Sequence, residues 1–164
     1  MADSFRTADL VDEHGDSLSV CDTQFLQFGG IKSFAGRLRT VSCFQDVGLL
    51  WEVLRTRGDG CVLVIDGGGS LHSALMGDLI AGTAVANGWA GAVINGVVRD
   101  RIELAQLPLG VLALGTNPRR SGRTGAGQVD LVLSFGNATF RPGDTLVADV
   151  DGVVVLAAGT AQVG

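Results

Sequence analysis

Lysine is almost absent from this 164-residue chain. Lys32 is the only one, and it lies in the glycine-rich turn at residues 29–32, far in sequence from the strand ends described below. An enzyme that forms an imine with a carbonyl compound needs a lysine whose pKa is lowered inside a pocket. The sequence therefore gives no support to imine chemistry.

Positive charge is scarce as well. Charged residues make up 18% of the chain, the net charge is −5 and the sequence pI is about 4.8. Only Arg119, Arg120 and Arg123 cluster, within the long segment 115–128, which is rich in glycine, serine and threonine and predicts a loop. Because binding to a phosphate backbone relies on clustered basic side chains, we do not expect a nucleic acid as a partner.

The chain has few cysteines, and its first residues do not have the pattern of a targeting signal. Cys43 and Cys61 lie in apolar runs, which favours buried free thiols over disulfides or a zinc site. Residues 1–6 lack the apolar core of a signal peptide. Residues 79–98 carry no charge, but Asn-Gly pairs divide them into a helix, a turn and a strand. We therefore expect a cytoplasmic protein without a membrane span.

Hydrophobic residues are abundant, at 46%, and the length suits one domain over residues 1–164. The continuous apolar runs at 61–65 and 92–94 are typical of strands buried on both faces, and a helix is expected between them over 72–87. Other patterns predict helices at 7–13, 46–57 and 101–107, and strands at 37–44, 111–114, 131–135, 138–140, 145–150 and 153–156. The fold class is α/β, with a central strand–helix–strand unit and antiparallel strands toward both ends. So apolar a composition also favours an oligomer.

The two buried strands each end in a loop that contains glycine. If they are parallel neighbours, both loops open at one edge of the sheet, which is where α/β proteins usually bind ligands. Arg99 and Asp100 follow the second strand. Arginine can grip a carboxylate at two points, Asp100 could hold Mg²⁺ or Mn²⁺, and Glu103, one helical turn on, could orient a water at that metal. The alternative is a surface ion pair, with Glu103 as an ordinary helix charge.

The segment Gly77-Asp78-Leu79-Ile80 offers a second candidate. If the chain breaks there, the backbone amides before a helix lack partners and could bind an anion. The alternative is that Gly77 only allows close helix packing. Residues 66–70 have neither the Gly-x-Gly-x-x-Gly spacing nor a following Lys-Ser or Lys-Thr, so a tight turn is the better interpretation there.

An ordered set of motifs spans nearly the whole chain and resembles the family of regulator of ribonuclease activity A and 4-hydroxy-4-methyl-2-oxoglutarate aldolase. The motifs are Gln27-Phe28-Gly29-Gly30, Thr40-Val41-x-Cys43-Phe44, Leu63-Val64-Ile65-Asp66-Gly67-Gly68-Gly69-Ser70, Gly77-Asp78-Leu79, Asn95-Gly96-Val97-Val98-Arg99-Asp100 and Leu114-Gly115-Thr116-Asn117-Pro118. The family's older label, a menaquinone methyltransferase, finds no support in a methyl-donor loop here.

The resemblance implies a swivelling β/β/α sandwich, a ring-shaped homotrimer and active sites near subunit boundaries. It implies class II, metal-dependent aldolase activity toward 4-hydroxy-4-methyl-2-oxoglutarate, with oxaloacetate decarboxylation. The backbone of residues 77–80 would hold the pyruvyl part of a 2-keto acid, Arg99 its carboxylate and keto end, and Asp100 the divalent metal. The alternative is a non-enzymatic regulator that binds and inhibits a ribonuclease E-type enzyme. The intact Arg99-Asp100-x-x-Glu103 pattern favours the enzyme.

Overall fold

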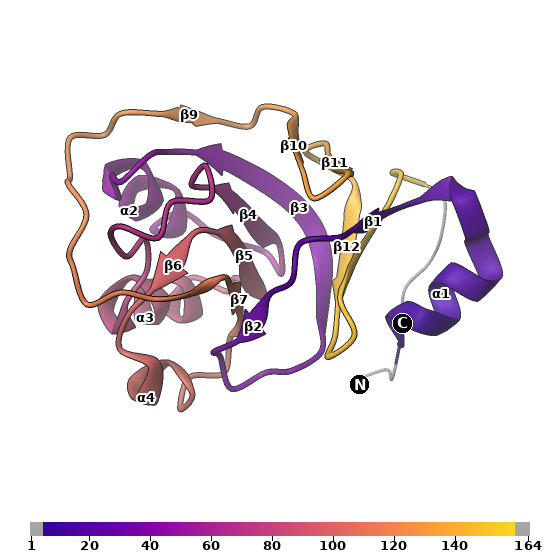
Figure 1. Cartoon of the computed structure of the whole chain (residues 1–164), viewed down its shortest axis with the longest axis horizontal. Helices are drawn as coiled ribbons and strands as arrows, with labels where there is room; N and C mark the ends of the chain where they lie inside the picture. Colours follow the sequence, from indigo (N-terminus) through magenta and orange to yellow (C-terminus); the bar gives the residue numbers. More distant parts are fainter. Residues whose placement is uncertain (1–4, 160–164) are drawn as a thin grey trace.

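A curled sheet runs through the molecule and changes from antiparallel to parallel along its width (Figure 1). In the computed structural model, which describes residues 5–159, the strands are β1 (Leu18–Cys21), β2 (Leu26–Gln27), β3 (Phe34–Ser42), β4 (Val62–Asp66), β5 (Gly91–Asn95), β6 (Val97–Val98), β7 (Gly110–Ala113), β8 (Gly115–Thr116), β9 (Gln128–Val129), β10 (Leu133–Phe135), β11 (Ala138–Phe140), β12 (Thr145–Ala148) and β13 (Val153–Leu156). The helices are α1 (Thr7–His14), α2 (Gly48–Leu54), α3 (Asp78–Ala86) and α4 (Arg101–Leu104), with a short 3₁₀ turn, η1 (Gly15–Ser17).

The strand order of the main sheet is β1-β13-β12-β3-β4-β5-β7-β2, with β9 paired to β3. The pairs β3–β4, β4–β5 and β5–β7 are parallel, and the other pairs of this sheet are antiparallel. Strand β3 joins the two parts, because residues 34–37 pair with β12 and residues 38–42 pair with β4. The predicted α/β class, with a parallel strand–helix–strand centre and antiparallel strands toward the ends, is confirmed.

Two hydrophobic cores explain the continuous apolar run of β4. Leu63 and Ile65 face a core shared with α2 and α3, whereas Val62 and Val64 face a second core shared with β12, β13 and the hairpin β10–β11. Successive side chains of a strand point to opposite faces, so a strand covered on both faces must be apolar throughout. Figure 1 shows α2, α3 and α4 gathered on one side, with α1 at the opposite end beyond β1.

The helix expected over residues 72–87 is wrong for its first six residues. Residues 72–77 are a loop, and α3 begins at Asp78 and ends at Ala86. Residues 73–76 of this loop are buried, and the amides of Ala74 and Leu75 donate to the carbonyl oxygens of residues 119 and 97 instead of forming helical hydrogen bonds. The rest of the uncharged segment 79–98 divides into α3, a turn, β5 and β6, as expected. Among residues 5–159, no helix is long and apolar enough to cross a membrane.

Other expected elements are present with shifted ends. Strand β3 begins at Phe34 rather than at residue 37, and its first side chain packs over Gly91 and Gly110, where any Cβ would collide with the Phe34 ring. Helix α1 is fixed to the sheet by Asp149, whose carboxylate accepts hydrogen bonds from the Thr7 amide and hydroxyl, both at 2.7 Å.

The three cysteines are free; Cys43 is buried, as expected, but Cys61 is only partly buried.

Candidate functional site

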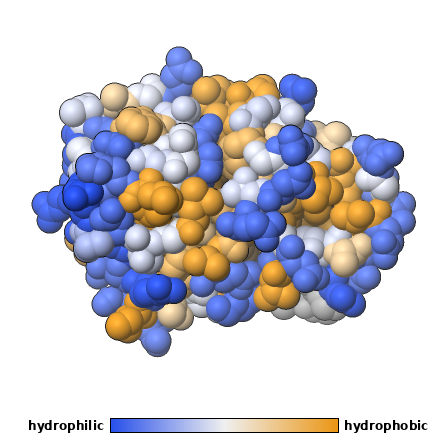
Figure 2. Space-filling view, in the orientation of Figure 1, coloured by the Kyte–Doolittle hydropathy of each residue, from blue (hydrophilic) through white to orange (hydrophobic). Residues whose placement is uncertain are grey.

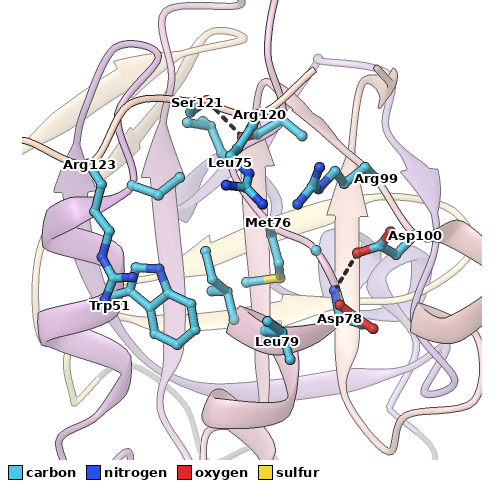
Figure 3. Close-up of a pocket in the computed structure, with 14 residues that line it drawn as sticks. Trp51, Leu75, Met76, Asp78, Leu79, Arg99, Asp100, Arg120, Ser121 and Arg123 are labelled. Carbon is cyan, nitrogen blue, oxygen red and sulfur yellow. Dashed lines mark hydrogen bonds between the residues drawn. The ribbon is translucent and has the colours of Figure 1, made fainter. Parts of the chain in front are cut away.

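Three loops meet beyond the carboxyl ends of β4, β5 and β7. Asp66 at the end of β4 pairs with Asn95 at the end of β5, so the loops that follow open at the same edge, as predicted. Strand β6 pairs in parallel with β8, and the Leu75 amide donates to the Val97 carbonyl oxygen at 2.9 Å. These contacts frame a cavity of about 260 Å³ (Figure 3).

Arg99 and Asp100 both line this cavity. The Arg99 amide donates to the Met76 carbonyl oxygen at 3.0 Å, and its guanidinium Nη1 reaches the Pro118 carbonyl oxygen at 3.4 Å. Asp100 has a left-handed backbone conformation, with φ of 59°, and its Oδ2 accepts a hydrogen bond from the Asp78 amide at 3.0 Å. The structure thus brings together two of the predicted residues on one wall and places them against the start of α3.

Gly77 explains how Asp100 comes so close to α3. A Cβ on Gly77 would lie 2.6 Å from Asp100 Oδ2 and 3.4 Å from Arg99 Cγ, so close packing requires glycine here. The chain also breaks at this point, because Gly77 is extended and has no side chain of its own to cap α3. The first-turn amides of a helix have no partners within it, and residues 78–80 line the cavity. Both interpretations of Gly77 therefore apply: it allows close packing, and it lies where the chain breaks before α3.

Glu103 is the predicted residue that the structure does not bring to the cavity. It is exposed on α4, which ends one residue later at Leu104, and it is not among the residues that line the cavity. A role through an intervening water stays a prediction.

Eight further residues that line the cavity were not predicted as site residues, and four of them carry polar or aromatic side chains: Trp51, Arg120, Ser121 and Arg123. Trp51 belongs to α2, and the others belong to the long loop whose arginines we considered only as a nucleic-acid signal. Ser121 Oγ donates to the Ala74 carbonyl oxygen at 2.7 Å, which holds the loop against the cavity wall. Arg123 lies over the Trp51 ring, with 4.8 Å between its Cζ and the ring centroid. The signal available in the sequence was the length of the loop, since long loops are usually functional.

Asp46 fixes the far end of this loop. Its buried carboxylate accepts hydrogen bonds from the Thr124 amide and hydroxyl, both at 2.7 Å, and from the Gly125 and Gly48 amides, both at 3.0 Å. Burial alone would raise the pKa of Asp46, but these donors stabilise the charged form and lower the pKa to about 2. Asp46 thus binds the first amide of α2 and ties the loop to the start of that helix.

The donor set of the cavity offers two carboxylates to a divalent metal ion. Asp78 and Asp100 are the carboxylates that line it, and no group of three or more His, Cys, Asp or Glu side chains suited to a metal occurs within residues 5–159. Mg²⁺ is commonly held by one or two carboxylates, with waters and the substrate completing its shell. The residues therefore fit a metal that is bound jointly with a chelating ligand, and they do not form a protein-only cage.

Together, the fold and this cavity define a class of α/β protein that holds an arginine–aspartate pair at the carboxyl edge of parallel strands. The chain matches the family described as "RraA-like: Aldolase/RraA" over residues 7–155, and it belongs to that family. The family contains both aldolases and inhibitors of RNA processing. The predicted family and the β/β/α fold are thereby confirmed.

Solved structures agree with this membership. A Geobacillus kaustophilus protein named S-adenosylmethionine:2-dimethylmenaquinone methyltransferase is 43% identical, with a TM-score of 0.93 over 98% of this chain and 100% of that one. The RNA-processing inhibitor RraA from Thermus thermophilus is 42% identical, with a TM-score of 0.93 over 98% of each chain. Streptomyces coelicolor RraAS2, at 24% identity and a TM-score of 0.78 over 93% of this chain and 80% of that one, shows the fold alone.

Proposed function

We propose that this chain is a class II, divalent-metal-dependent aldolase that cleaves 4-hydroxy-4-methyl-2-oxoglutarate into two pyruvates and also decarboxylates oxaloacetate. The observation that carries the proposal is the shared cavity of Arg99, Asp100 and the first turn of α3. A guanidinium, a carboxylate and backbone amides thus face one small volume. This is the chemistry needed to bind a 2-keto acid and to stabilise the negative charge that develops on it.

Arg99 binds the carboxylate and keto end of the substrate through its planar fork, and the amides of Leu79 and Ile80 hold the same three-carbon unit. As the bond between C3 and C4 breaks, its electron pair moves between C2 and C3, and negative charge collects on the keto oxygen. Arg99 stabilises this enolate. The 4-hydroxyl group loses its proton as the second pyruvate forms, and C3 of the enolate gains a proton to give the first.

We assign to the Asp78 carboxylate the removal of the proton from the 4-hydroxyl group. Its side chain is exposed on the cavity wall, whereas Asp100 Oδ2 already accepts the Asp78 amide. With oxaloacetate, the same bond position breaks to release carbon dioxide and leaves the same pyruvate enolate, so no additional group is needed. One set of side chains therefore serves both reactions.

Asp100 would hold the divalent metal, and we expect Mg²⁺ or Mn²⁺ because its oxygen atoms are hard donors. When bound, the metal supplies Lewis-acid stabilisation of the developing negative charge. Gly77 and the Asp78 amide fix the orientation of the Asp100 carboxylate, so these residues determine where such a metal is held.

The test is pyruvate release by the purified protein from both substrates, measured with Mg²⁺, with EDTA, and after Mg²⁺ is restored. We expect turnover to be lost with EDTA and recovered with Mg²⁺, and to be lost in Asp100→Asn. Turnover that continues in EDTA, or an Asp100→Asn variant as active as the wild type, would contradict the proposal.

A second candidate function comes from the Thermus thermophilus protein, which is named as an RNA-processing inhibitor and is 42% identical. Under this candidate the chain binds a ribonuclease E-type enzyme through its acidic surface. A pull-down at low and high salt with wild type and Asp100→Ala separates the two functions. Surface binding should weaken with salt and survive the substitution, whereas catalysis should be lost in Asp100→Ala.

We also propose a homotrimer whose subunit boundary lies near the cavity. Leu79, which lines the cavity, is 72% accessible, and Ile102 in α4 is 76% accessible. Figure 2 shows that the face seen in Figure 1 carries several patches of hydrophobic side chains between hydrophilic ones. Light scattering after size-exclusion chromatography gives the mass directly, and a monomer would contradict this proposal.

A further inference from the structure

The Arg99 guanidinium has a single hydrogen-bond acceptor among residues 5–159, the Pro118 carbonyl oxygen, which lies 3.4 Å from Nη1. The ion pairs within this part of the chain do not include Arg99. Arginine carries five N–H donors in a planar fork, so this contact leaves Nε and Nη2 free to bind a carboxylate at two points. The Pro118 carbonyl therefore determines which edge of the guanidinium faces the cavity.

The contact between Arg99 and Pro118 is needed, and it is easily lost. In Figure 3 the guanidinium of Arg120 lies beside that of Arg99, and like charges repel each other. At 3.4 Å the contact is longer than the roughly 2.7–3.2 Å of ordinary N–H···O bonds, so a further shift of about 0.2 Å would end it. Proline has no backbone N–H with which to anchor itself. The position of the Pro118 carbonyl must therefore be set by its neighbours.

Asn117 sets this position through the peptide group that joins Pro118 to Arg119. Asn117 Oδ1 accepts a hydrogen bond from the Arg119 amide at 2.9 Å and so closes an Asx turn around Pro118. The Arg119 N–H and the Pro118 carbonyl belong to one planar trans peptide group and point in opposite directions. Asn117 therefore holds one edge of this plane, while Arg99 Nη1 contacts the other edge.

Asn117 is itself tied to two other segments. Its amide donates to the carbonyl oxygen of Val98, the residue before Arg99, at 3.0 Å. Its Nδ2 donates to the Leu71 carbonyl oxygen at 2.8 Å. Asn117 is partly buried and is not among the residues that line the cavity. The turn is thus fixed to the strand end that carries Arg99, and its side-chain anchor lies outside the cavity.

We propose that Asn117 is a positioning residue for Arg99 and that it directs the guanidinium toward the cavity through the Pro118 carbonyl. The inference rests on the proposed function only for the chemical role of Arg99, which binds the substrate and stabilises its enolate. Because Asn117 does not line the cavity, loss of its side chain should act as a partial loss of Arg99.

The matched pair of variants is Asn117→Ala and Asn87→Ala. Asn87 is also partly buried, donates through Nδ2 to the Thr83 carbonyl oxygen at 2.9 Å, and lies outside the cavity lining. Both substitutions therefore remove a side-chain donor to a backbone carbonyl, and a general loss of stability affects both. Asn117→Ser is a milder variant, because its hydroxyl group can accept the Arg119 amide and keep the turn.

The position of Arg99 is tested without substrate by NMR of the arginine side chains. The Nε–H signal of Arg99 is identified by its loss in Arg99→Lys. We expect the order parameter of this group to fall in Asn117→Ala, to fall less in Asn117→Ser and to stay unchanged in Asn87→Ala. An unchanged order parameter in Asn117→Ala, or an equal fall in Asn87→Ala, would overturn the inference.

Kinetics test whether Asn117 acts through Arg99. We expect Asn117→Ala to lower kcat/KM for pyruvate release from oxaloacetate by about tenfold, which is within the range for residues of one hydrogen-bond network. In the Arg99→Lys background the same substitution should lower it by about twofold or less, since no guanidinium is left to position. An equal further loss in both backgrounds would show a general structural role and overturn the inference.

The two measurements also separate this inference from the proposed function. A wild type that releases no pyruvate, combined with an Arg99 signal that depends on Asn117, would contradict the aldolase and leave the positioning role in place. Metal-dependent pyruvate release that Asn117→Ala does not lower would leave the aldolase in place and overturn the positioning role.

Discussion

The two sides of the cavity are built in different ways. Arg99 and Asp100 follow directly on β6. The Arg99 amide donates to the Met76 carbonyl oxygen, and the Asp100 carboxylate accepts a hydrogen bond from the Asp78 amide. Arg120 and Arg123 belong to a loop that wraps around the α2 side of the molecule (Figure 1) and is held by the side chains of Ser121 and Asp46 and by scattered backbone hydrogen bonds. Under the proposed function, the reacting end of the substrate meets the strand ends, and the loop forms the other side of the cavity.

This difference suggests a division of labour. Groups that stabilise a transition state must be held to within a fraction of an ångström, and strand ends provide that precision. Groups that choose among ligands can lie on loops, whose sequences change without disturbing the core. Substitutions on the strand side should therefore lower activity toward every substrate, and substitutions on the loop side should alter the choice among substrates.

The largest effect is expected on the strand side, at Arg99. Arg99→Gln should lower kcat/KM by about 100-fold or more for both oxaloacetate and 4-hydroxy-4-methyl-2-oxoglutarate, because it removes charge stabilisation of the enolate. Steady-state pyruvate release measures this. Arg119→Gln, with the same charge change outside the cavity, serves as the control. Similar losses in both variants would mean that Arg99 has no special place in the reaction.

Gly77 tests how narrowly the strand side is fixed. In Gly77→Ala the new Cβ would lie 2.6 Å from Asp100 Oδ2, so the carboxylate must move and its hydrogen bond from the Asp78 amide is weakened. We expect activity to fall by about tenfold to 100-fold, since a shift of about 1 Å at a catalytic group can cost as much. In a Mg²⁺ titration, the variant should reach half of its maximal activity at a higher Mg²⁺ concentration than the wild type does.

The matched control is Gly82→Ala in the same helix. A Cβ on Gly82 meets nothing within 4 Å, and alanine is favoured over glycine inside helices by about 1 kcal/mol. This variant should keep its activity and melt at the same or a higher temperature. If Gly77→Ala behaves like Gly82→Ala, the packing of Gly77 against Asp100 has no functional importance.

The sequence predicted the strand side better than the loop side, for a physical reason. The apolar runs of β4 and β5 are local signals, and their parallel pairing places Arg99 and Asp100 by topology alone. The path of the loop depends on Asp46, which lies 78 residues before Thr124, and no local pattern reports such a contact. The helix predicted over residues 72–77 was wrong for the same reason, because Ala74 and Leu75 pair with residues that are distant in the sequence. Glu103 was predicted as a site residue because it lies one helical turn after Asp100, but in the structure its side chain is exposed to solvent.

Asp46 tests what holds the loop. Because its folded-state pKa of about 2 lies below the ordinary value, the charged carboxylate stabilises the fold above about pH 4, and this contribution is lost as the pH falls toward 2. Asp46→Asn should therefore lower the free energy of unfolding by about 1–2 kcal/mol at neutral pH. The difference from wild type should shrink below about pH 4 and be lost as the pH falls through 2, as followed by urea unfolding across the pH range. A difference independent of pH would show that the charge is irrelevant.

The smallest effect is expected at Trp51, which supports the loop arginine that lies farthest from the reacting groups. Arg123 and Arg55 lie over its ring, at 4.8 and 5.3 Å from the centroid, and such contacts contribute about 0.5–1 kcal/mol at exposed sites. Trp51→Leu should raise KM for 4-hydroxy-4-methyl-2-oxoglutarate by about twofold to fivefold and leave kcat unchanged, whereas Trp51→Phe, which keeps an aromatic face, should raise KM less. An equal rise in both variants would assign the effect to the packing of α2. A fall in kcat would mean that the loop side also acts on the reacting end, and the division between the two sides would no longer hold.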